Sequence, residues 1–418
     1  MSVLPEGWVE TTLGEVCDVL DSRRVPVNAK ERAGRPGPVP YFGATGQVGW
    51  IDRPLFNEEL LLLGEDGAPF LDTRKPKAYL IRGPAWVNNH AHVLRARTVT
   101  SNRFLLHALN WIDYRRFVSG TTRLKLTQAA MNVIPIPLPP LAEQGRIVAA
   151  IEEQFSRLDE AELLLKSARR RLTPMAAAVI DGATKGFASK SIGKLIREPL
   201  RNGHSARRSA TGTVPVFTLS SVTERDFSDR NTKLIDVDPK RVEDLWVEPG
   251  DIFVERSNTP ALVGSAALYR GPAKKAIFPD LLIRIRFGTA VTPEYSELAL
   301  RSTPIRRYFQ RNAKGIAGSM PKIDQTTILA AELPVPPVVE QMRIIEEASL
   351  QLSLVESLAT AIDHALTRSD HLRRSILEGA FTGKLVPQVS DDEPAFELLA
   401  RIASDHRKTA KPRRRQRA

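Results

Sequence analysis

Two stretches of the chain are nearly the same sequence: Pro-Leu-Pro-Pro-Leu-Ala-Glu-Gln-Gly-Arg-Ile at residues 137–147 and Pro-Val-Pro-Pro-Val-Val-Glu-Gln-Met-Arg-Ile at residues 334–344. They lie 197 positions apart, and the same offset pairs further identical residues, from Lys125 with Lys322 to Gly186 with Gly383, without a gap. Identities kept in one register over this length indicate an internal duplication. The period is too long for a solenoid repeat, so each copy is expected to be a domain with its connector.

The local patterns predict the same order of elements in both copies. Apolar runs broken by Gly and Pro predict short strands, among them Glu59–Leu63, Val87–Leu94 and Leu281–Phe287. The proline-rich stretches then favour an extended chain over a helix. After them, apolar residues recur every three or four positions and predict one long helix in each copy. The first stripe is Ile147, Ile151, Leu158, Ala161, Leu165, Ala168, Leu172, Met175 and Val179, and the second is Ile345, Ala348, Leu352, Val355, Ala359, Ile362 and Leu366.

Stripes of this length are typical of coiled-coil seams, and each needs a partner helix. Because a lobe lies between the two helices in sequence, they can pair antiparallel within one chain; an intermolecular coiled coil is the alternative. The sequence predicts an α+β protein with two similar mixed α/β lobes, separated by two long helices that form an intramolecular antiparallel coiled coil. The predicted boundaries are lobes at 1–140 and 187–336, helices at 141–186 and 337–386, and a basic C-terminal extension at 387–418.

Composition limits the class of protein. The net charge of +12 is typical of nucleic-acid binding, but residues 401–418 alone hold eight basic side chains against one acidic. This end is either a solubilising extension or a non-specific phosphate anchor. Cys17 is the single cysteine, which excludes an internal disulfide and suits a reducing cytoplasm. No signal peptide and no apolar run of roughly 18 residues are found, so we expect a soluble, cytoplasmic protein.

Motifs for catalysis are missing from the sequence. It has no Gly-rich phosphate-binding loop and no pattern typical of an amino-methyltransferase, so we expect neither catalysis nor a cofactor in this chain. Cys17 has no neighbouring histidine and is expected to be a buried thiol. His90 and His92 would share one face of a strand and could bind a metal or a phosphate. With no third ligand in view, we predict no metal site there.

Polar and basic loop residues are the candidates for contact with DNA, because they reach base edges and phosphates. In the first lobe these are Thr45, Gln47, Asn88, Asn89, His90, Arg123 and Lys125, and in the second Arg256, Ser257, Asn258, Ser319 and Lys322. Lys125 and Lys322 occupy equivalent positions of the repeat, which favours a shared contact to the DNA backbone. A solvated surface loop is the alternative for each of these residues.

Several motifs resemble those of one protein family. They are Tyr41-Phe-Gly-Ala-Thr-Gly46, Leu61-Leu-Leu-Gly-Glu-Asp-Gly67, Asn88-Asn-His-Ala-His-Val93, Glu255-Arg-Ser-Asn-Thr-Pro260 and the two Pro-Pro-x-x-Glu-Gln-x-Arg-Ile entries to the helices. With them, the chain resembles the specificity subunit of Type I restriction–modification systems over nearly its whole length. The resemblance implies two target-recognition domains, each reading half of a bipartite, asymmetric sequence in double-stranded DNA.

The resemblance also implies partners and a division of labour. Two modification subunits would dock on the spacer helices and methylate adenine with S-adenosylmethionine, and a restriction subunit would use ATP and Mg²⁺ to cleave. This chain would be non-catalytic. The residues expected on the spacer and partner-binding helices are Glu143, Gln144, Arg146, Leu158, Leu165, Glu340, Gln341, Arg343, Val355 and Ile362. The alternative function is a coiled-coil scaffold whose lobes bind proteins without DNA specificity.

Overall fold

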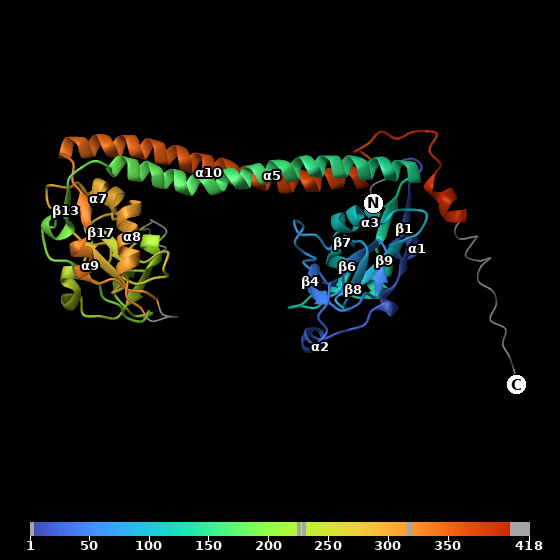
Figure 1. The fold of residues 1–418 in the computed structure, drawn as a ribbon, viewed down its shortest axis with the longest axis horizontal. Coiled ribbons are helices and arrows are strands. Elements are labelled where there is room, and N and C mark those ends of the chain that lie inside the picture. The colour runs from blue at the N-terminus through green and yellow to red at the C-terminus, as the bar shows by residue number, and fades with distance from the viewer. Residues whose placement is uncertain (1–3, 224–226, 228–230, 316–319, 402–418) are drawn as a thin grey trace. The chain divides into compact units, whose positions relative to one another are not determined.

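The computed structural model describes residues 4–223, 227, 231–315 and 320–401. The chain forms two compact units. Unit 1 contains the described residues up to Leu165 together with those from His364 onward, and unit 2 contains those from Lys166 to Asp363. Each unit holds one mixed α/β lobe and a segment of each of two long helices (Figure 1).

The lobe of unit 1 is built from short strands and helices. In chain order they are β1 Val9–Thr12, α1 Leu13–Val16, β2 Cys17–Val19, the 3₁₀ helix η1 Asp21–Arg23, α2 Ala29–Ala33, β3 Val39–Gly43, β4 Gly46–Ile51, β5 Phe56–Asn57, β6 Leu60–Gly64, β7 Ala78–Ile81, β8 Pro84–Val87, β9 Ala91–Ala96, α3 Asn102–Trp111, η2 Tyr114–Arg116, β10 Val118–Ser119, β11 Lys125–Leu126, α4 Gln128–Asn132 and β12 Pro135–Leu138.

Two four-stranded sheets form the body of this lobe, with orders β2-β9-β6-β7 and β4-β3-β8-β5. β6 is apolar along its whole length because both of its faces are covered. Leu61 and Leu63 pack into the core that includes α3, whereas Leu60 and Leu62 pack into a second core shared with β8 and β9. The expected single strand at 87–94 is wrong, because β8 ends at Val87 and residues 88–90 form a turn before β9.

The lobe of unit 2 repeats this plan with shorter strands. Its elements are β13 Ser189–Ser191, η3 Ile192–Lys194, β14 Arg201–Asn202, β15 Val214–Phe217, α6 Ser220–Thr223, β16 Thr232–Ile235, η5 Pro239–Leu245, β17 Ile252–Glu255, β18 Ala266–Leu268, β19 Leu282–Ile285, α7 Pro293–Leu300, α8 Thr303–Asn312, α9 Gln325–Ala330 and β20 Glu332–Pro334. The sheet β14-β19-β17-β18 corresponds to β2-β9-β6-β7 of unit 1, and the duplication seen in the sequence is therefore also present in the fold.

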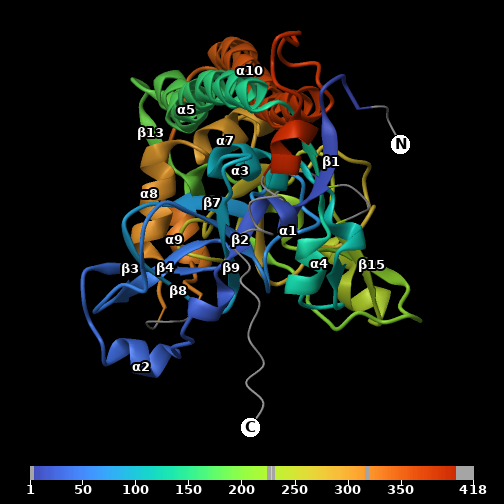
Figure 2. The ribbon, with the colours of Figure 1, turned by 90° about the vertical axis from the view of Figure 1, so that its right-hand side faces the viewer.

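Two helices of 44 residues follow the proline-rich stretches: α5 Leu141–Thr184 and α10 Val338–Phe381. In each unit their segments run side by side in both views (Figures 1 and 2). In unit 1, Arg373 of α10 donates to Asp159 (2.6 Å) and Glu162 (3.0 Å) of α5. In unit 2, Arg169 of α5 donates to Asp363 of α10 (3.1 Å). Later residues of α5 thus meet earlier residues of α10, and the predicted antiparallel, intramolecular pairing is confirmed within each unit.

The seam between the helices agrees only in part with the predicted stripes. Val355 and Ile362 of α10 are buried as predicted, and Leu158 and Leu165 of α5 are half-buried. The prediction is wrong at three positions of α5 that the structure leaves exposed: Ala161, Ala168 and Met175. The residues after the first two, Glu162 and Arg169, take their places because they form the ion pairs with α10.

The first part of the C-terminal extension belongs to unit 1. Asp392 forms an ion pair with Arg146 of α5 (2.5 Å), and the backbone N–H of Ala395 donates to the carbonyl of Gly7 (2.9 Å). Ala395 is buried, and residues 395–401 are helical. The first part of the predicted C-terminal extension therefore packs against the lobe and helix of unit 1. Residues 402–418 lie outside the described part of the chain.

Within the described residues, no helix is long and apolar enough to cross a membrane.

Candidate nucleic-acid interface

The same backbone arrangement forms at the end of a central strand in both units. In unit 1, Glu65 follows β6; its N–H donates to the carbonyl of His90 (2.8 Å) and its carbonyl accepts from the N–H of Leu126 (2.8 Å). In unit 2, Arg256 follows β17; its N–H donates to Leu281 (2.7 Å) and its carbonyl accepts from Ile323 (2.9 Å). Leu126 and Ile323 are related by the repeat offset. We call each of these sites a strand-end corner.

The strand-end corner of unit 1 brings several predicted residues together. Asp66 forms an ion pair with the Nε of Arg123 (2.5 Å), and one of its carboxylate oxygens lies 3.5 Å from the Nδ1 of His90. Glu65 forms one with the Nζ of Lys125 (3.4 Å). The basic side chains are more exposed, 59% for Arg123 and 53% for Lys125, than the carboxylates that hold them, 24% for Asp66 and 14% for Glu65. The basic side chains of this corner therefore face solvent, and the carboxylates that pair with them lie beneath.

The β3–β4 hairpin lies beside this corner. Thr45 and Gln47 are exposed at and after its tip, and the hydroxyl of Tyr79 anchors the tip by donating to the carbonyl of Gly43 (2.5 Å). β4 is an edge strand, and Trp50 on it is 57% exposed, which is unusual for so large an aromatic side chain. The sequence reasoning missed Trp50; its signal was the tryptophan in a glycine-rich stretch.

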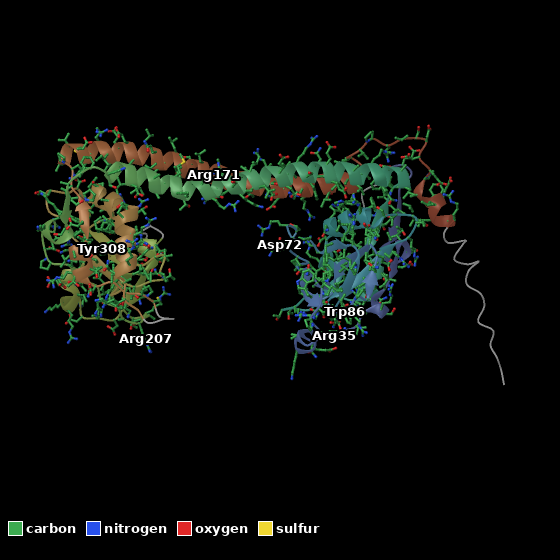
Figure 3. All side chains as sticks on the ribbon, in the orientation of Figure 1. Arg35, Asp72, Trp86, Arg171, Arg207 and Tyr308 are labelled. Atoms are coloured by element: carbon green, nitrogen blue, oxygen red, sulfur yellow. The ribbon has the colours of Figure 1, made fainter. Side chains whose placement is uncertain are left out.

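Arginines flank the same sheet. The guanidinium of Arg32 lies over the ring of Tyr41 (4.7 Å), and that of Arg35 lies over the ring of Trp86 (4.7 Å; Figure 3). Cation–π contacts of this kind hold a positive charge at a fixed place on the surface. Arg35 also pairs with Asp52 (2.7 Å). These arginines, too, were missed, because Tyr41 follows Arg32 by nine positions and Trp86 follows Arg35 by 51, both on other elements.

The strand-end corner of unit 2 has a different chemistry. Arg256 is half-buried, and no ion pair of its side chain is found among the described residues. Beneath it, Glu255 is fully buried and accepts hydrogen bonds from Thr223 (2.5 Å) and Asn258 (3.0 Å). Burial raises the pKa of Glu255 above its usual value. Lys322 is exposed beside the corner, bonded through its backbone to Lys314.

Two predicted contacts with DNA are corrected by burial. Asn88 is 7% exposed, and its Oδ1 accepts from the N–H of His90 (2.8 Å), so it shapes the turn before β9. Ser257 is 3% exposed. Neither side chain can reach a groove of DNA from these positions. Asn89 is exposed and stays a candidate, Asn258 is held by Glu255, and Ser319 lies outside the described residues.

His90 and His92 do not share a strand face. His92 is buried on β9, with Nδ1 2.6 Å from Asp21 and Nε2 2.9 Å from the carbonyl of Leu126. Asp21, Glu65 and His92 are the one group of possible metal ligands in the described part of the chain. The guanidinium of Arg24 lies between the two carboxylates, 3.1 Å from Asp21 and 2.7 Å from Glu65. It supplies the positive charge that a metal ion would bring.

Cys17 is buried at the start of β2, and its thiol donates to the carbonyl of Leu13 (2.9 Å). Burial raises the pKa of the Cys17 thiol to about 12. A thiol with this pKa is protonated at neutral pH and is a poor nucleophile. The expectation of a buried thiol is confirmed.

The repeated glutamines at the helix entries are internal. Gln144 donates to the carbonyls of Val99 and Pro139 (3.0 Å each), and Gln341 donates to those of Ala290 and Pro336 (2.8 Å each). Both glutamines are buried and tie the first turn of a long helix to its own lobe. Both lie on the long helices, as predicted, and their side chains serve the junction between helix and lobe.

The acidic residues before these glutamines differ between the copies. Glu143 lies on α5 as predicted; it is buried, accepts a hydrogen bond from the indole of Trp8 (3.1 Å), and has its pKa raised by burial. Its counterpart Glu340 is more exposed and pairs with Arg343, which is 56% exposed. Arg146 is held by Asp392 within unit 1. The pair Glu340–Arg343 of the second copy is therefore more exposed to solvent than the pair Arg146–Asp392 of the first.

Gln341→Ala is expected to destabilise unit 2 more than the loss of one hydrogen bond would. The change removes the two bonds to Ala290 and Pro336 and a third from the N–H of Thr292 (2.8 Å). Buried backbone groups left unpaired cost about 1–3 kcal/mol each. We expect the Tm to fall by roughly 5–10 °C, measured by thermal denaturation of the full chain. Glu340→Ala, one residue earlier, is the control and should leave the Tm nearly unchanged; equal Tm values for both variants would contradict the assignment.

Comparison with known proteins agrees with this arrangement. Residues 5–164 match the family model of the Type I restriction modification DNA specificity domain. A putative Type I restriction enzyme specificity subunit of Haemophilus influenzae is 24% identical over 386 residues, which cover 87% of this chain and 94% of the relative. The EcoKI specificity subunit of Escherichia coli K12 is 25% identical over 343 residues, covering 75% and 74%.

Solved structures share the fold. A chain from a study of complex assembly and conformational transition of the Type I R-M system has a TM-score of 0.71 at 18% identity, covering 92% of this chain and 100% of that one. The HsdS subunit of Thermoanaerobacter tengcongensis has a TM-score of 0.53 at 19% identity, covering 91% and 98%. With the duplicated lobes and the paired helices, these findings confirm the resemblance seen in the sequence: over most of its length the chain is similar to the specificity subunits of Type I restriction–modification systems.

Proposed function

We propose that this chain is the specificity subunit of a Type I restriction–modification complex and reads a bipartite, asymmetric sequence in double-stranded DNA. Unit 1 would read one half and unit 2 the other. The observation that carries this proposal is the pair of strand-end corners, which share their backbone arrangement but present different side chains. Two recognition sites with the same backbone arrangement and different side chains suit a target whose two halves differ in sequence.

Each half-site would be read in the major groove by direct contacts with base edges, with affinity from phosphate contacts. In unit 1 the exposed residues that suit this are Thr45, Gln47, Asn89, Arg123 and Lys125, joined by Trp50. In unit 2 the candidates are the half-buried Arg256 and the exposed Lys322. Arginine can bind a guanine edge with two hydrogen bonds, so Arg256 is the candidate for base reading in the second half-site.

Two modification subunits would dock on the helix pair. Both units leave large apolar side chains of these helices exposed, which is costly unless a partner covers them. In unit 2, Leu350, Leu354 and Leu358 are 66%, 58% and 50% exposed and form a stripe at four-residue spacing on α10. In unit 1, Leu163 and Leu164 of α5 are 68% and 67% exposed.

The chemistry would reside in the partners. The modification subunits would bind S-adenosylmethionine and methylate adenine, and a restriction subunit would bind ATP and Mg²⁺ and cleave. This chain would contribute recognition and assembly alone, without catalysis, in the cytoplasm.

Genome-wide mapping of methylated adenines, with and without the gene, tests the proposal. A bipartite motif that disappears with the gene is the expected result. A motif that persists in its absence would refute the proposal. The alternative of a coiled-coil scaffold predicts unchanged methylation and a chain that ignores duplex DNA even with its partner subunits.

Lys125→Ala and Lys322→Ala are each expected to weaken DNA binding evenly across sequences. Both lysines lie at equivalent positions and are exposed, as suits a contact with phosphate. Losing one such contact should reduce the slope of log K against log salt by about 0.9. Titrations of the assembled complex at several salt concentrations measure this slope. Arg256→Ala is the contrasting variant, because it should weaken binding only to targets with an intact second half-site; equal effects of all three on specificity would contradict the division.

A further inference from the structure

Two carboxylates at the strand-end corner of unit 1 hold cations that face solvent. Asp66 grips Arg123 at 2.5 Å and lies 3.5 Å from His90, and Glu65 holds Lys125 at 3.4 Å. Glu65 also forms an ion pair with Arg24 (2.7 Å). The contacts come from segments far apart in sequence, so the carboxylates fix the 123–125 segment against the end of β6.

The fold itself does not need these carboxylates. In unit 2 the same corner has Arg256 and Ser257 at the positions of Glu65 and Asp66. The backbone bonds are nevertheless kept, from Arg256 to Leu281 and from Ile323 to Arg256. Asp66 and Lys125 form an isolated β-bridge, as do Ser257 and Lys322. Because the frame closes without acidic side chains, the role of the carboxylates in unit 1 goes beyond holding the backbone.

Carboxylates on a DNA-facing surface carry an electrostatic cost. They repel phosphates and neutralise part of the positive charge that supplies non-specific affinity. A long arginine side chain, however, loses much conformational entropy when it is held for one base contact. An ion pair that fixes the guanidinium before binding lowers that loss and restricts the directions in which Arg123 can donate. Such an arrangement sacrifices general affinity for selectivity.

We propose that Asp66 is a positioning residue for the first half-site, and that it acts by fixing the guanidinium of Arg123 toward a base edge. Glu65 fixes Lys125 in the same way for the backbone. In unit 2 the donor is carried directly by the strand end, as Arg256, and needs no acidic holder. This inference rests on the proposed function, because it names how that function is carried out at one corner.

The test is Asp66→Asn in the full chain assembled with its modification subunits. Asparagine keeps the shape and an acceptor oxygen but loses the charge that grips Arg123. Once the wild-type motif has been mapped, binding is compared for duplexes with an intact and with an altered first half-site. We expect the ratio of these affinities to fall about tenfold, while affinity for the altered duplex rises about twofold, because one repulsive charge is gone. Discrimination at the second half-site should not change.

A double-mutant cycle separates positioning from other roles. In an Arg123→Ala background, Asp66→Asn should change discrimination no further, because its effect passes through Arg123. Asp113→Asn is the matched control: Asp113 also grips an arginine of unit 1, Arg115, at 2.5 Å, and its loss should leave discrimination unchanged. A fall in binding to both duplexes would indicate damage to the fold and overturn the inference. So would a rise in affinity without a change in the ratio, which an ordinary surface acid would give.

The outcome also distinguishes this inference from the proposed function. If the wild-type complex yields no bipartite methylation motif, the proposed function fails. If the motif is present and Asp66→Asn keeps the wild-type ratio, only the positioning role fails.

Discussion

Exchanging residues 1–140 for the first lobe of another specificity subunit is expected to change one half of the methylated target and leave the other half as it was. Each unit has its own hydrophobic core and its own strand-end corner. Base contacts made by loops that share no residues should be nearly additive, so altering one set leaves the other intact. The methylation motif of cells expressing the chimaera measures both halves at once.

The packing of unit 1 sets a condition for this experiment. Phe381 of α10 stacks on Trp111 (5.2 Å between ring centroids) and meets Phe104 edge-on (5.5 Å), and the indole of Trp111 donates to Glu378 (2.7 Å). A donor lobe must keep aromatic residues at these positions or bring its own 376–401 segment. The reciprocal exchange of residues 187–336 is the control and should change the other half alone. A chimaera that folds and alters both halves would refute independent reading.

Two substitutions at neighbouring positions are expected to have different effects: Val355→Lys should lower the stability of the chain, and Leu354→Lys should weaken assembly with a modification subunit. Leu354 is 58% exposed, whereas Val355 is buried between the helices of unit 2 in a cavity that Arg169 and Arg306 also line. Val355→Lys buries a charge at an apolar position of the seam, which should cost about 2–3 kcal/mol or more. Leu354→Lys should keep the stability of the chain but weaken binding of a modification subunit at least about tenfold, since it removes apolar contact from the centre of the exposed stripe.

Thermal denaturation of the free chain and titration with purified modification subunit measure the two effects. Both variants add one positive charge at neighbouring positions, so a general effect of charge would appear equally in both. Normal assembly by Leu354→Lys would contradict the proposal that the exposed leucine stripe of α10 binds a modification subunit. A normal Tm for Val355→Lys would contradict the seam between α5 and α10.

The sequence was sufficient for the duplication, the helices and their pairing, because these depend on local and periodic signals. The prolines at 135–140 exclude a helix before α5, and apolar residues at three- and four-residue spacing form the stripe of α10. The stripe of α5 was predicted with a slip at Ala161 and Ala168, because apolar spacing alone was followed. Glu162 and Arg169 occupy the seam through ion pairs with residues about 200 positions away, and no local pattern encodes such pairs.

The candidate site could be predicted by residue type but not by contact. Arg123 and Lys125 were correctly predicted to be exposed, although Lys125 begins the short strand β11. Their carboxylate partners, Asp66 and Glu65, are almost 60 positions earlier in the chain. Asn88 was expected to be exposed because asparagine usually is, but its side chain closes a turn. Whether a polar side chain faces solvent or closes the backbone depends on tertiary packing, which spacing does not reveal.

The two strand-end corners also have a consequence for how such proteins diverge. One corner carries two acids and the other an arginine and a serine, while the main-chain bonds that close them are the same. Substitutions at these positions therefore change what is presented to the ligand without removing any bond that closes the backbone. Mutations can accumulate there without loss of the folded state, whereas Gln144 and Gln341, whose side chains make the closing bonds themselves, leave no such freedom. New target preferences can thus arise by single substitutions at a few positions of an otherwise unchanged scaffold.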